Sequence, residues 1–343
     1  MKILVVRGAF GDSYEPAWCR ALTENGHSVI FFDSHEVIGI SLICRIQKRI
    51  NFGVDINRMR VRLLDLIKSR RPNVTLFYQG HYFDAETIDA AKEYTFVVGY
   101  HNDDPFGPRK NLLRYRVLNR AISHYDGYHF YRIQNVLEAK ALGLSNSELL
   151  LPYYIPSIDF QRGDRSVFSC DICYVGHFEG DIRSRCLNAV HAAGYDVVIR
   201  GEHKYWAKHL SQSLLRKLTP LAPVYGGEYR EVLSSTKIAA SFFSKWNRDG
   251  YTRRSFEIPA CGAFMLSERT PEMSDLFKEG VHCDYFSNVD EFLDKCRFYI
   301  ANERIREKIA AQGHSHVISN GHDINSRLRQ WVSQVEVWME SSS

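Results

Sequence analysis

The sequence predicts an α/β protein with two Rossmann-like domains, each a parallel sheet wrapped by helices. Short apolar runs alternate with helical patterns along the chain, which is typical of parallel strands joined by crossover helices. At 343 residues the chain is longer than one hydrophobic core usually serves. Residues 151–159 contain two prolines and no helical period, so they mark the expected boundary between the domains.

The first domain offers five apolar runs as parallel strands, at residues 2–6, 28–32, 74–78, 96–100 and 127–131. Ligands of such sheets bind in the crevice at the carboxyl ends of the strands. The residues that directly follow each run are therefore the candidates for a site.

Two glycines follow the first run. Gly8 and Gly11 would let a backbone approach a substrate closely, but they lack the GxGxxG spacing of a dinucleotide fingerprint. A plain strand-to-helix turn, with Asp12 or Ser13 capping the next helix, explains the same residues.

Histidines end two other runs. His101 follows the run at 96–100 and opens a polar cluster, and His81 lies just after the run at 74–78. Residues 102–105 also have the composition of a turn that caps the following helix, and this turn is compatible with a role for His101.

Residues 42–71 are strongly basic. Apolar residues recur at helical spacing in the first part of this stretch, which fits a helix lying on an anionic membrane surface or receiving an anionic acceptor. A solvated helix face packed on its own sheet explains the same pattern. We favour this second interpretation, because a basic face alone is weak evidence for membrane or acceptor binding.

The second domain is expected to begin its sheet at residues 171–176, followed by a helix that carries Arg183. A later segment, 249–286, reads as a basic loop, a short helix, a glycine at Gly262 and a strand at 263–266. Arg253 and Arg254 lie where the helix begins, and backbone N–H groups at a helix start suit a phosphate. Glu257, one turn later, suits paired sugar hydroxyls. The alternative is that Glu257 complements the helix dipole and that the arginines are a solvated face.

The composition and net charge argue against a membrane-spanning protein and against a nucleic-acid-binding protein. The hydrophobic fraction of 45% and the charged fraction of 24% are those of a globular protein, and no apolar run is long enough to cross a bilayer. The first residues pass directly into a strand, so we expect a cytoplasmic location. A net charge of +4 does not indicate nucleic acid as a partner. Cys170 and Cys173 form a CxxC without a second pair, so both are expected to be structural.

The segment RSFEIPACGAFMLSERTPEMSDLF, at residues 254–277, resembles the signature of the CgeB-like (spore maturation protein) glycosyltransferases. That group belongs to the GT-B superfamily. The resemblance implies the GT-B architecture: two Rossmann-like domains facing a central cleft, with a C-terminal helix that crosses back to the first domain. The implied division is an acceptor domain at 1–155, a donor domain at 156–320 and the returning helix at 321–343.

The resemblance also implies roles for individual residues. Retaining members of the superfamily carry two acidic residues eight positions apart, and Asp249 and Glu257 have this spacing, with Asp249 standing where Glu is usual. By this analogy Glu257 binds the donor ribose and Asp249 faces the donor sugar. His101 matches a histidine that lies against the donor sugar, and His81 is the second candidate for that role. Asp12 lies on the loop that often holds the base of inverting enzymes.

The expected diphosphate contacts depart from the common pattern. Related retaining enzymes have Arg and Lys in the loop after the first strand of the donor domain, and this chain has His177 and Arg183 at those places. Arg253 or Arg254 is expected to compensate. Residues 201–203 and 225–228, which include Tyr225, are expected to flank the nucleobase.

The predicted function is transfer of a sugar from a nucleotide diphosphate sugar to a glycan, lipid-linked or protein acceptor, in glycan or cell-surface polysaccharide synthesis. No DxD motif occurs in the usual setting, so cationic side chains are expected to take the place of a metal. The resemblance to retaining members of the superfamily implies retaining chemistry. One alternative is an inverting transferase with Asp12 or Asp103 as base. Another is an inactive binding protein on the same scaffold.

Overall fold

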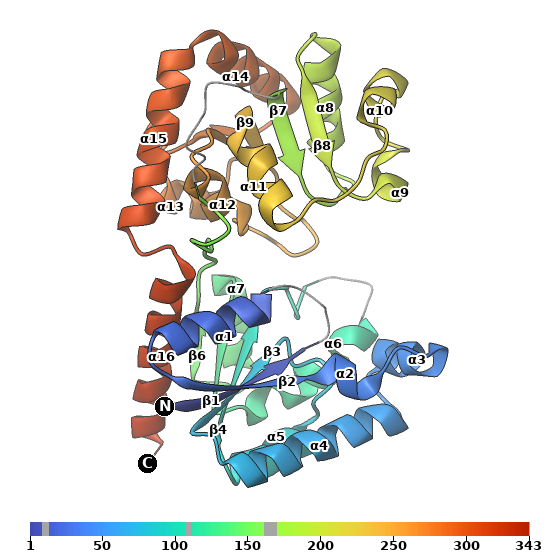
Figure 1. The fold of residues 1–343 in the computed structure, drawn as a ribbon, viewed down its shortest axis with the longest axis vertical. Coiled ribbons are helices and arrows are strands. Elements are labelled where there is room, and N and C mark those ends of the chain that lie inside the picture. Colours follow the sequence, from blue (N-terminus) through green and yellow to red (C-terminus); the bar gives the residue numbers. More distant parts are fainter. Residues whose placement is uncertain (9–13, 108–111, 161–169, 343) are drawn as a thin grey trace. The chain divides into compact units, whose positions relative to one another are not determined.

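The computed structural model describes residues 1–8, 14–107, 112–160 and 170–342. The chain divides into two compact units, and each has a sheet with helices packed around it (Figure 1). The first unit is Met1–Leu151 together with Ile324–Ser343, and the second is Pro152–Asp323. The boundaries expected from the sequence lie within a few residues of these. Gly11 and Asp12 lie outside the described residues.

The first unit is built on a six-stranded parallel sheet. In sheet order its strands are β2 (Ser28–Asp33), β1 (Lys2–Arg7), β3 (Val74–Tyr78), β4 (Phe96–His101), β5 (Gly127–Phe130) and β6 (Ser147–Leu149). The five predicted strands are confirmed, to within one residue at their ends. β6 was not predicted, because three residues are too few to show a period. The sheet is closely packed, with Ile3, Leu4, Val5 and Val6 of β1 fully buried.

Helices cover both faces of this sheet (Figure 1). They are α1 (Tyr14–Glu24), α2 (Ser34–Ile38), α3 (Leu42–Ile50), α4 (Val54–Arg70), α5 (Ala85–Lys92), α6 (Leu112–Ala121), the short 3-10 helix η1 (Ile122–His124), α7 (Ile133–Ala141) and α16 (Ile324–Ser341). α16 packs on α1, as expected for the final helix, with the Trp331 ring 5.9 Å from that of Trp18.

The second unit has a five-stranded parallel sheet. In sheet order its strands are β11 (Asp284–Phe286), β10 (Met265–Glu268), β9 (Thr236–Ser241), β7 (Cys170–Val175) and β8 (Val197–Arg200). β10 begins two residues later than the sequence predicted. The backbone N–H of Ala263 still bonds back to Ile258 after the left-handed Gly262, so the extended strand starts only beyond this helix end. Cys170 and Cys173 are buried along β7, and burial raises the pKa of the Cys173 thiol well above its usual value.

The helices of the second unit are α8 (Arg183–Ala192), α9 (His203–Trp206), α10 (Gln212–Leu218), α11 (Gly226–Ser234), α12 (Arg254–Ala260), α13 (Pro271–Leu276), α14 (Val289–Ala301) and α15 (Glu303–Ser319). α8, α12 and α16 confirm the helices that the sequence predicted. Among the described residues, no helix combines the length and the apolar character that a membrane span needs.

The segment predicted as a linker is tied into the second unit. The Tyr154 N–H donates to the His322 carbonyl, and the Ile155 N–H donates to Asp159 at 2.8 Å. Asp159 is buried. Only the first residues of 151–159 therefore mark the boundary, and the remainder contributes polar groups to the interior.

Candidate functional site

The strand order of the second sheet places a switch point at β7. The chain passes from β7 to β8 on one side and then returns to β9 on the other side of β7. Connections that leave in opposite directions open a crevice at the carboxyl ends of such strands, where ligands of doubly wound sheets bind. The loops that line this edge are residues 176–182, after β7, and residues 242–253, after β9.

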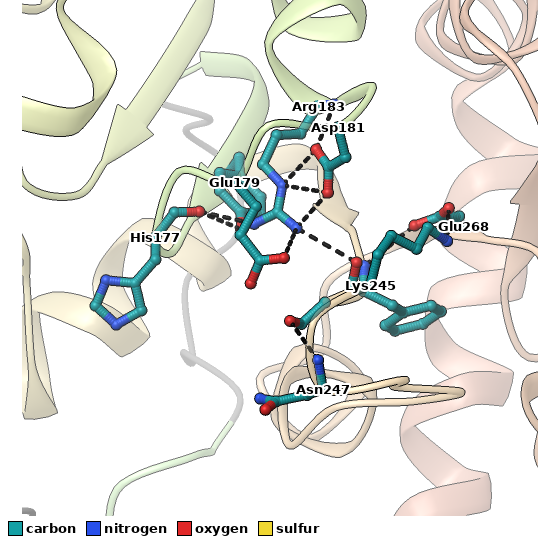
Figure 2. Close-up of polar contacts among 10 residues, drawn as sticks. His177, Glu179, Asp181, Arg183, Lys245, Asn247 and Glu268 are labelled. Carbon is teal, nitrogen blue, oxygen red and sulfur yellow. Dashed lines mark hydrogen bonds and ion pairs between the residues drawn. The ribbon is translucent and has the colours of Figure 1, made fainter. Parts of the chain in front are cut away.

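Arg183 joins these two loops (Figure 2). Its side chain is only 3% exposed and forms a double contact with Asp181, with the closest pair at 2.6 Å. The same guanidinium donates to the Tyr174 hydroxyl at 2.9 Å and to the carbonyls of His177 and Phe243 at 2.7 and 3.3 Å. Protein acceptors thus occupy Arg183. These contacts give Arg183 a structural role, and its predicted diphosphate contact stays a prediction.

The loop after β9 is held in a defined shape from both ends. Glu268 accepts from the Phe243 N–H at 3.1 Å and pairs with Lys245 at 2.5 Å. Further on, the Asp249 N–H donates to the Ser244 carbonyl, and Arg248 has a φ of 50°, which is unusual outside glycine. Such strain is characteristic of functional loops. This loop carries Asp249 to the edge of the sheet.

Arg254 lies close to the end of β7. A Cβ placed on Gly176 would lie 3.3 Å from its Nη1 atom, and its guanidinium lies over the Tyr174 ring at 5.7 Å. His177 is next in the chain, and Figure 2 shows its imidazole directed away from Arg183. The structure therefore brings Arg254 and His177 together at the switch point, where the sequence predicted diphosphate contacts.

Glu257 lies one turn into α12 and is buried. It accepts a hydrogen bond from the Tyr229 hydroxyl at 2.7 Å and pairs with Arg253 at 2.5 Å. Arg253 also lies 3.8 Å from Asp159 and over the Tyr153 ring. α11, which supplies Tyr229, begins beside Tyr225, whose side chain is strongly exposed. An exposed aromatic ring is a suitable surface for stacking a base.

The carboxyl of Asp159 has an unusual environment. Burial raises its pKa most strongly, the neighbouring Glu257 charge raises it further, and Arg253 and Arg230 only partly oppose these effects, so the pKa rises from 3.8 to about 7. The buried carboxyls of Asp159 and Glu257 therefore both lie close to Arg253, beside the nucleotide site that the sequence predicted.

Stability is expected to depend on pH through Asp159. Because the folded pKa lies above the unfolded value, the native protein holds the proton more tightly, and the free energy of unfolding should fall as pH rises from 3.8 to about 7. Asp159→Asn should remove this loss and raise the thermal midpoint relative to the wild type at pH 8 more than at pH 5. Thermal unfolding across this range measures the difference. Asp290→Asn, at an exposed position, is the control, and an equal difference at both pH values would contradict the assignment.

The candidate residues of the first unit fall into two groups. A Cβ on Gly8 would lie 2.0 Å from the Tyr78 carbonyl oxygen, so the close approach that the structure shows at Gly8 is to the backbone at the end of β3. His81 and His101 are both fully buried and lie in one cluster with Tyr115, with the two imidazole rings 5.0 Å apart. The two strand-end histidines are therefore neighbours.

A family model described as glycosyl transferase-like matches residues 183–333, which contain Arg183, Asp249, Arg254 and Glu257. Over these residues the chain is similar to the glycosyl transferase-like family. No curated protein matches the sequence.

Solved structures share the fold of this chain over nearly its whole length. The sucrose-phosphate synthase of Thermosynechococcus elongatus has 11% identity and a TM-score of 0.70, with all of both chains covered. HepE of Anabaena, solved in complex with UDP-glucose, has 11% identity and a TM-score of 0.68, and the alignment covers 98% of this chain and 100% of that chain. The α,α-trehalose 6-phosphate synthase of Burkholderia multivorans has 10% identity and a TM-score of 0.65, with 100% and 99% covered. These similarities confirm the predicted fold of two parallel-sheet Rossmann-like domains.

Sequence reasoning missed several residues of the candidate site. Tyr174, Asp159 and Tyr229 contact the predicted residues Arg183, Arg253 and Glu257, respectively. Glu268 accepts from the Phe243 N–H in the loop that carries Asp249. The signal that could have found two of these residues is their position along the strands, since Glu268 is the last residue of β10 and Tyr174 lies within β7.

Proposed function

We propose that this protein is a glycosyltransferase, and that it takes a sugar from a nucleotide diphosphate sugar bound at the carboxyl edge of the second sheet. The observation that carries the proposal is the position of Arg254 beside Gly176 at the switch point, with Glu257 one turn further along α12. A cation and a carboxylate in this order suit a diphosphate followed by a ribose. HepE, a structure of the same fold, was solved with UDP-glucose, which supports a donor of this class.

Each donor contact follows from the chemistry of the side chain. Arg254, with His177 and Arg253, is proposed to stabilise negative charge on the leaving diphosphate as the glycosidic bond breaks. Glu257 is proposed to accept hydrogen bonds from the ribose hydroxyls. Tyr225 is proposed to stack on the base.

The proposed transfer is retaining and needs no metal. The bond from the anomeric carbon to the phosphate oxygen breaks, the acceptor oxygen bonds to the same face of that carbon, and the leaving phosphate oxygen takes the acceptor proton. No strong protein base is then required. His101 and Asp249 are proposed to contact the donor sugar, in agreement with the resemblance to retaining members of the GT-B superfamily.

The acceptor is proposed to be a glycan, a lipid-linked molecule or a protein, used in glycan or polysaccharide synthesis at the inner face of a membrane. The basic stretch 42–71 supports a peripheral membrane contact, because α3 keeps apolar side chains exposed next to arginines.

An inverting transferase is the second candidate, with Asp103 as the base in the described part of the chain. Asp103 follows β4 and accepts from the Tyr115 hydroxyl at 3.3 Å. The anomeric configuration of the product, determined by NMR, distinguishes the two mechanisms.

A thermal-shift panel of nucleoside diphosphates and nucleotide sugars, with and without EDTA, tests the proposal. A ligand at about a hundred times its Kd adds about 2.7 kcal/mol, so one nucleotide should raise the midpoint by a few degrees, with or without EDTA. Arg254→Met should abolish this shift, and Arg304→Met, at an exposed position on α15, should keep it. If no nucleotide stabilises the wild type, the protein is better described as a binding protein on the same scaffold. If EDTA abolishes the shift, metal-independent binding is wrong.

A further inference from the structure

An exposed apolar surface lies on α3 and on the turn that leads to α4. We call these side chains the α3 surface, and with their exposed fractions they are Ile40 (90%), Leu42 (71%), Ile43 (67%), Ile46 (54%), Ile50 (44%), Phe52 (68%) and Val54 (70%). Large exposed apolar patches mark interaction sites on soluble domains. The packing of the first unit leaves these residues uncovered.

The orientation of α3 explains this exposure. At 3.6 residues per turn, Leu42, Ile43, Ile46 and Ile50 fall on one stripe about 100° wide. The opposite side of the helix faces the protein: Cys44 is buried, and Gln47 exchanges hydrogen bonds of 2.8 Å with Asp55 of α4. α3 packs against α4 and α6. An ordinary surface helix turns its apolar stripe inward, and α3 turns it outward.

The charges around the α3 surface have one sign. Arg45 and Arg49 are exposed along one edge of the stripe. Residues 40–62 hold six Lys or Arg residues and one acidic residue, Asp55, which pairs with Arg58 at 3.1 Å. An apolar stripe bordered by arginines is complementary to lipid acyl chains below anionic headgroups.

A groove continues the α3 surface toward α6. Its volume is about 670 Å³, and Ile50 and Phe52 belong both to the groove and to the α3 surface. Arg116 and Arg120 of α6 line the same groove and are exposed. Cationic side chains from a second helix thus adjoin the apolar stripe.

We propose that the α3 surface docks on an anionic lipid bilayer. The apolar side chains enter the boundary between headgroups and acyl chains, and Arg45, Arg49, Arg116 and Arg120 contact lipid phosphates. This inference deepens the membrane contact of the proposed function and rests on it, since it names the residues and the charge of the lipid.

Vesicle flotation of the full chain tests the docking. The wild type should bind vesicles of phosphatidylcholine mixed with phosphatidylglycerol and bind pure phosphatidylcholine far more weakly. At about 1 kcal/mol for each arginine near the surface, Arg45→Gln/Arg49→Gln should weaken binding to the anionic vesicles about thirtyfold. Leu42→Ser/Ile43→Ser/Ile46→Ser should weaken it at least about tenfold, because the apolar contacts are lost.

Matched controls separate this surface from general effects. Ile305→Ser/Ile318→Ser and Arg304→Gln/Lys308→Gln change exposed residues of α15 and should bind like the wild type. Equal binding by the wild type and the triple serine variant would overturn the proposal. So would a wild type that forms dimers through this surface and binds no vesicles.

The nucleotide-induced thermal shift, measured without vesicles, separates failure of docking from failure of sugar transfer. All α3 variants should keep the shift of the wild type. Vesicle binding without any nucleotide shift contradicts only the proposed donor, and a nucleotide shift without vesicle binding contradicts only the docking.

Discussion

Replacing Glu257 with glutamine is expected to weaken binding of the preferred nucleoside diphosphate about a hundredfold. A hydrogen bond to a charged group contributes about 1.5–3 kcal/mol, and a carboxylate can accept from both ribose hydroxyls, whereas the amide of glutamine has one acceptor oxygen. A loss of about 3 kcal/mol corresponds to this factor. The substitution also removes the charge that faces Arg253 at 2.5 Å. Titration calorimetry measures the affinity.

The variant is nearly isosteric, so the Tyr229 hydroxyl keeps an acceptor at this position. Glu279→Gln is the matched control, because Glu279 also pairs with an arginine, Arg269 at 2.7 Å, but on an exposed surface. It should leave the affinity unchanged. A Glu257→Gln protein that folds and binds within about twofold of the wild type would remove Glu257 from the nucleotide site.

Arg183→Met is expected to destabilise the second unit by about 3–5 kcal/mol, which is the usual cost of breaking a buried ion pair by removing one partner. Arg183 is buried, and its loss leaves Asp181 and the carbonyls of His177 and Phe243 without their donor. The stability of the variant is measured by denaturant unfolding.

Arg185→Met provides a control on the same helix, since Arg185 is exposed and should change stability by no more than about 0.5 kcal/mol. Adding Asp181→Asn to Arg183→Met should recover part of the lost stability. The unpaired charge of Asp181 disappears, while the asparagine oxygen can still accept from the backbone N–H of residue 183. An Arg183→Met protein of normal stability that loses nucleotide affinity would contradict the structural role and support the diphosphate contact predicted from the sequence.

Much of the fold could be predicted because its signals are local. Each strand of the first sheet except β6 is an apolar run, and α14, α15 and α16 show helical periods. The segment at 254–277 pointed to the glycosyltransferase fold and to Glu257 through its residues alone. The start of β10 was misplaced by two residues, since only the observed backbone bond from Ala263 to Ile258 shows where the helix end stops.

What the sequence determined by itself was the order of the elements and the chemical types present at each strand end. Arg183 and Arg254 are alike in the sequence, each an arginine near a helix start. Only the tertiary structure showed that Arg183 is buried against Asp181 and that Arg254 lies beside Gly176. Likewise, periodicity predicted an apolar stripe on residues 42–50 but not its direction, which depends on whether α4 and α6 offer that stripe a surface. Pairing and burial are decided by groups distant along the chain, and for this reason they required the folded structure.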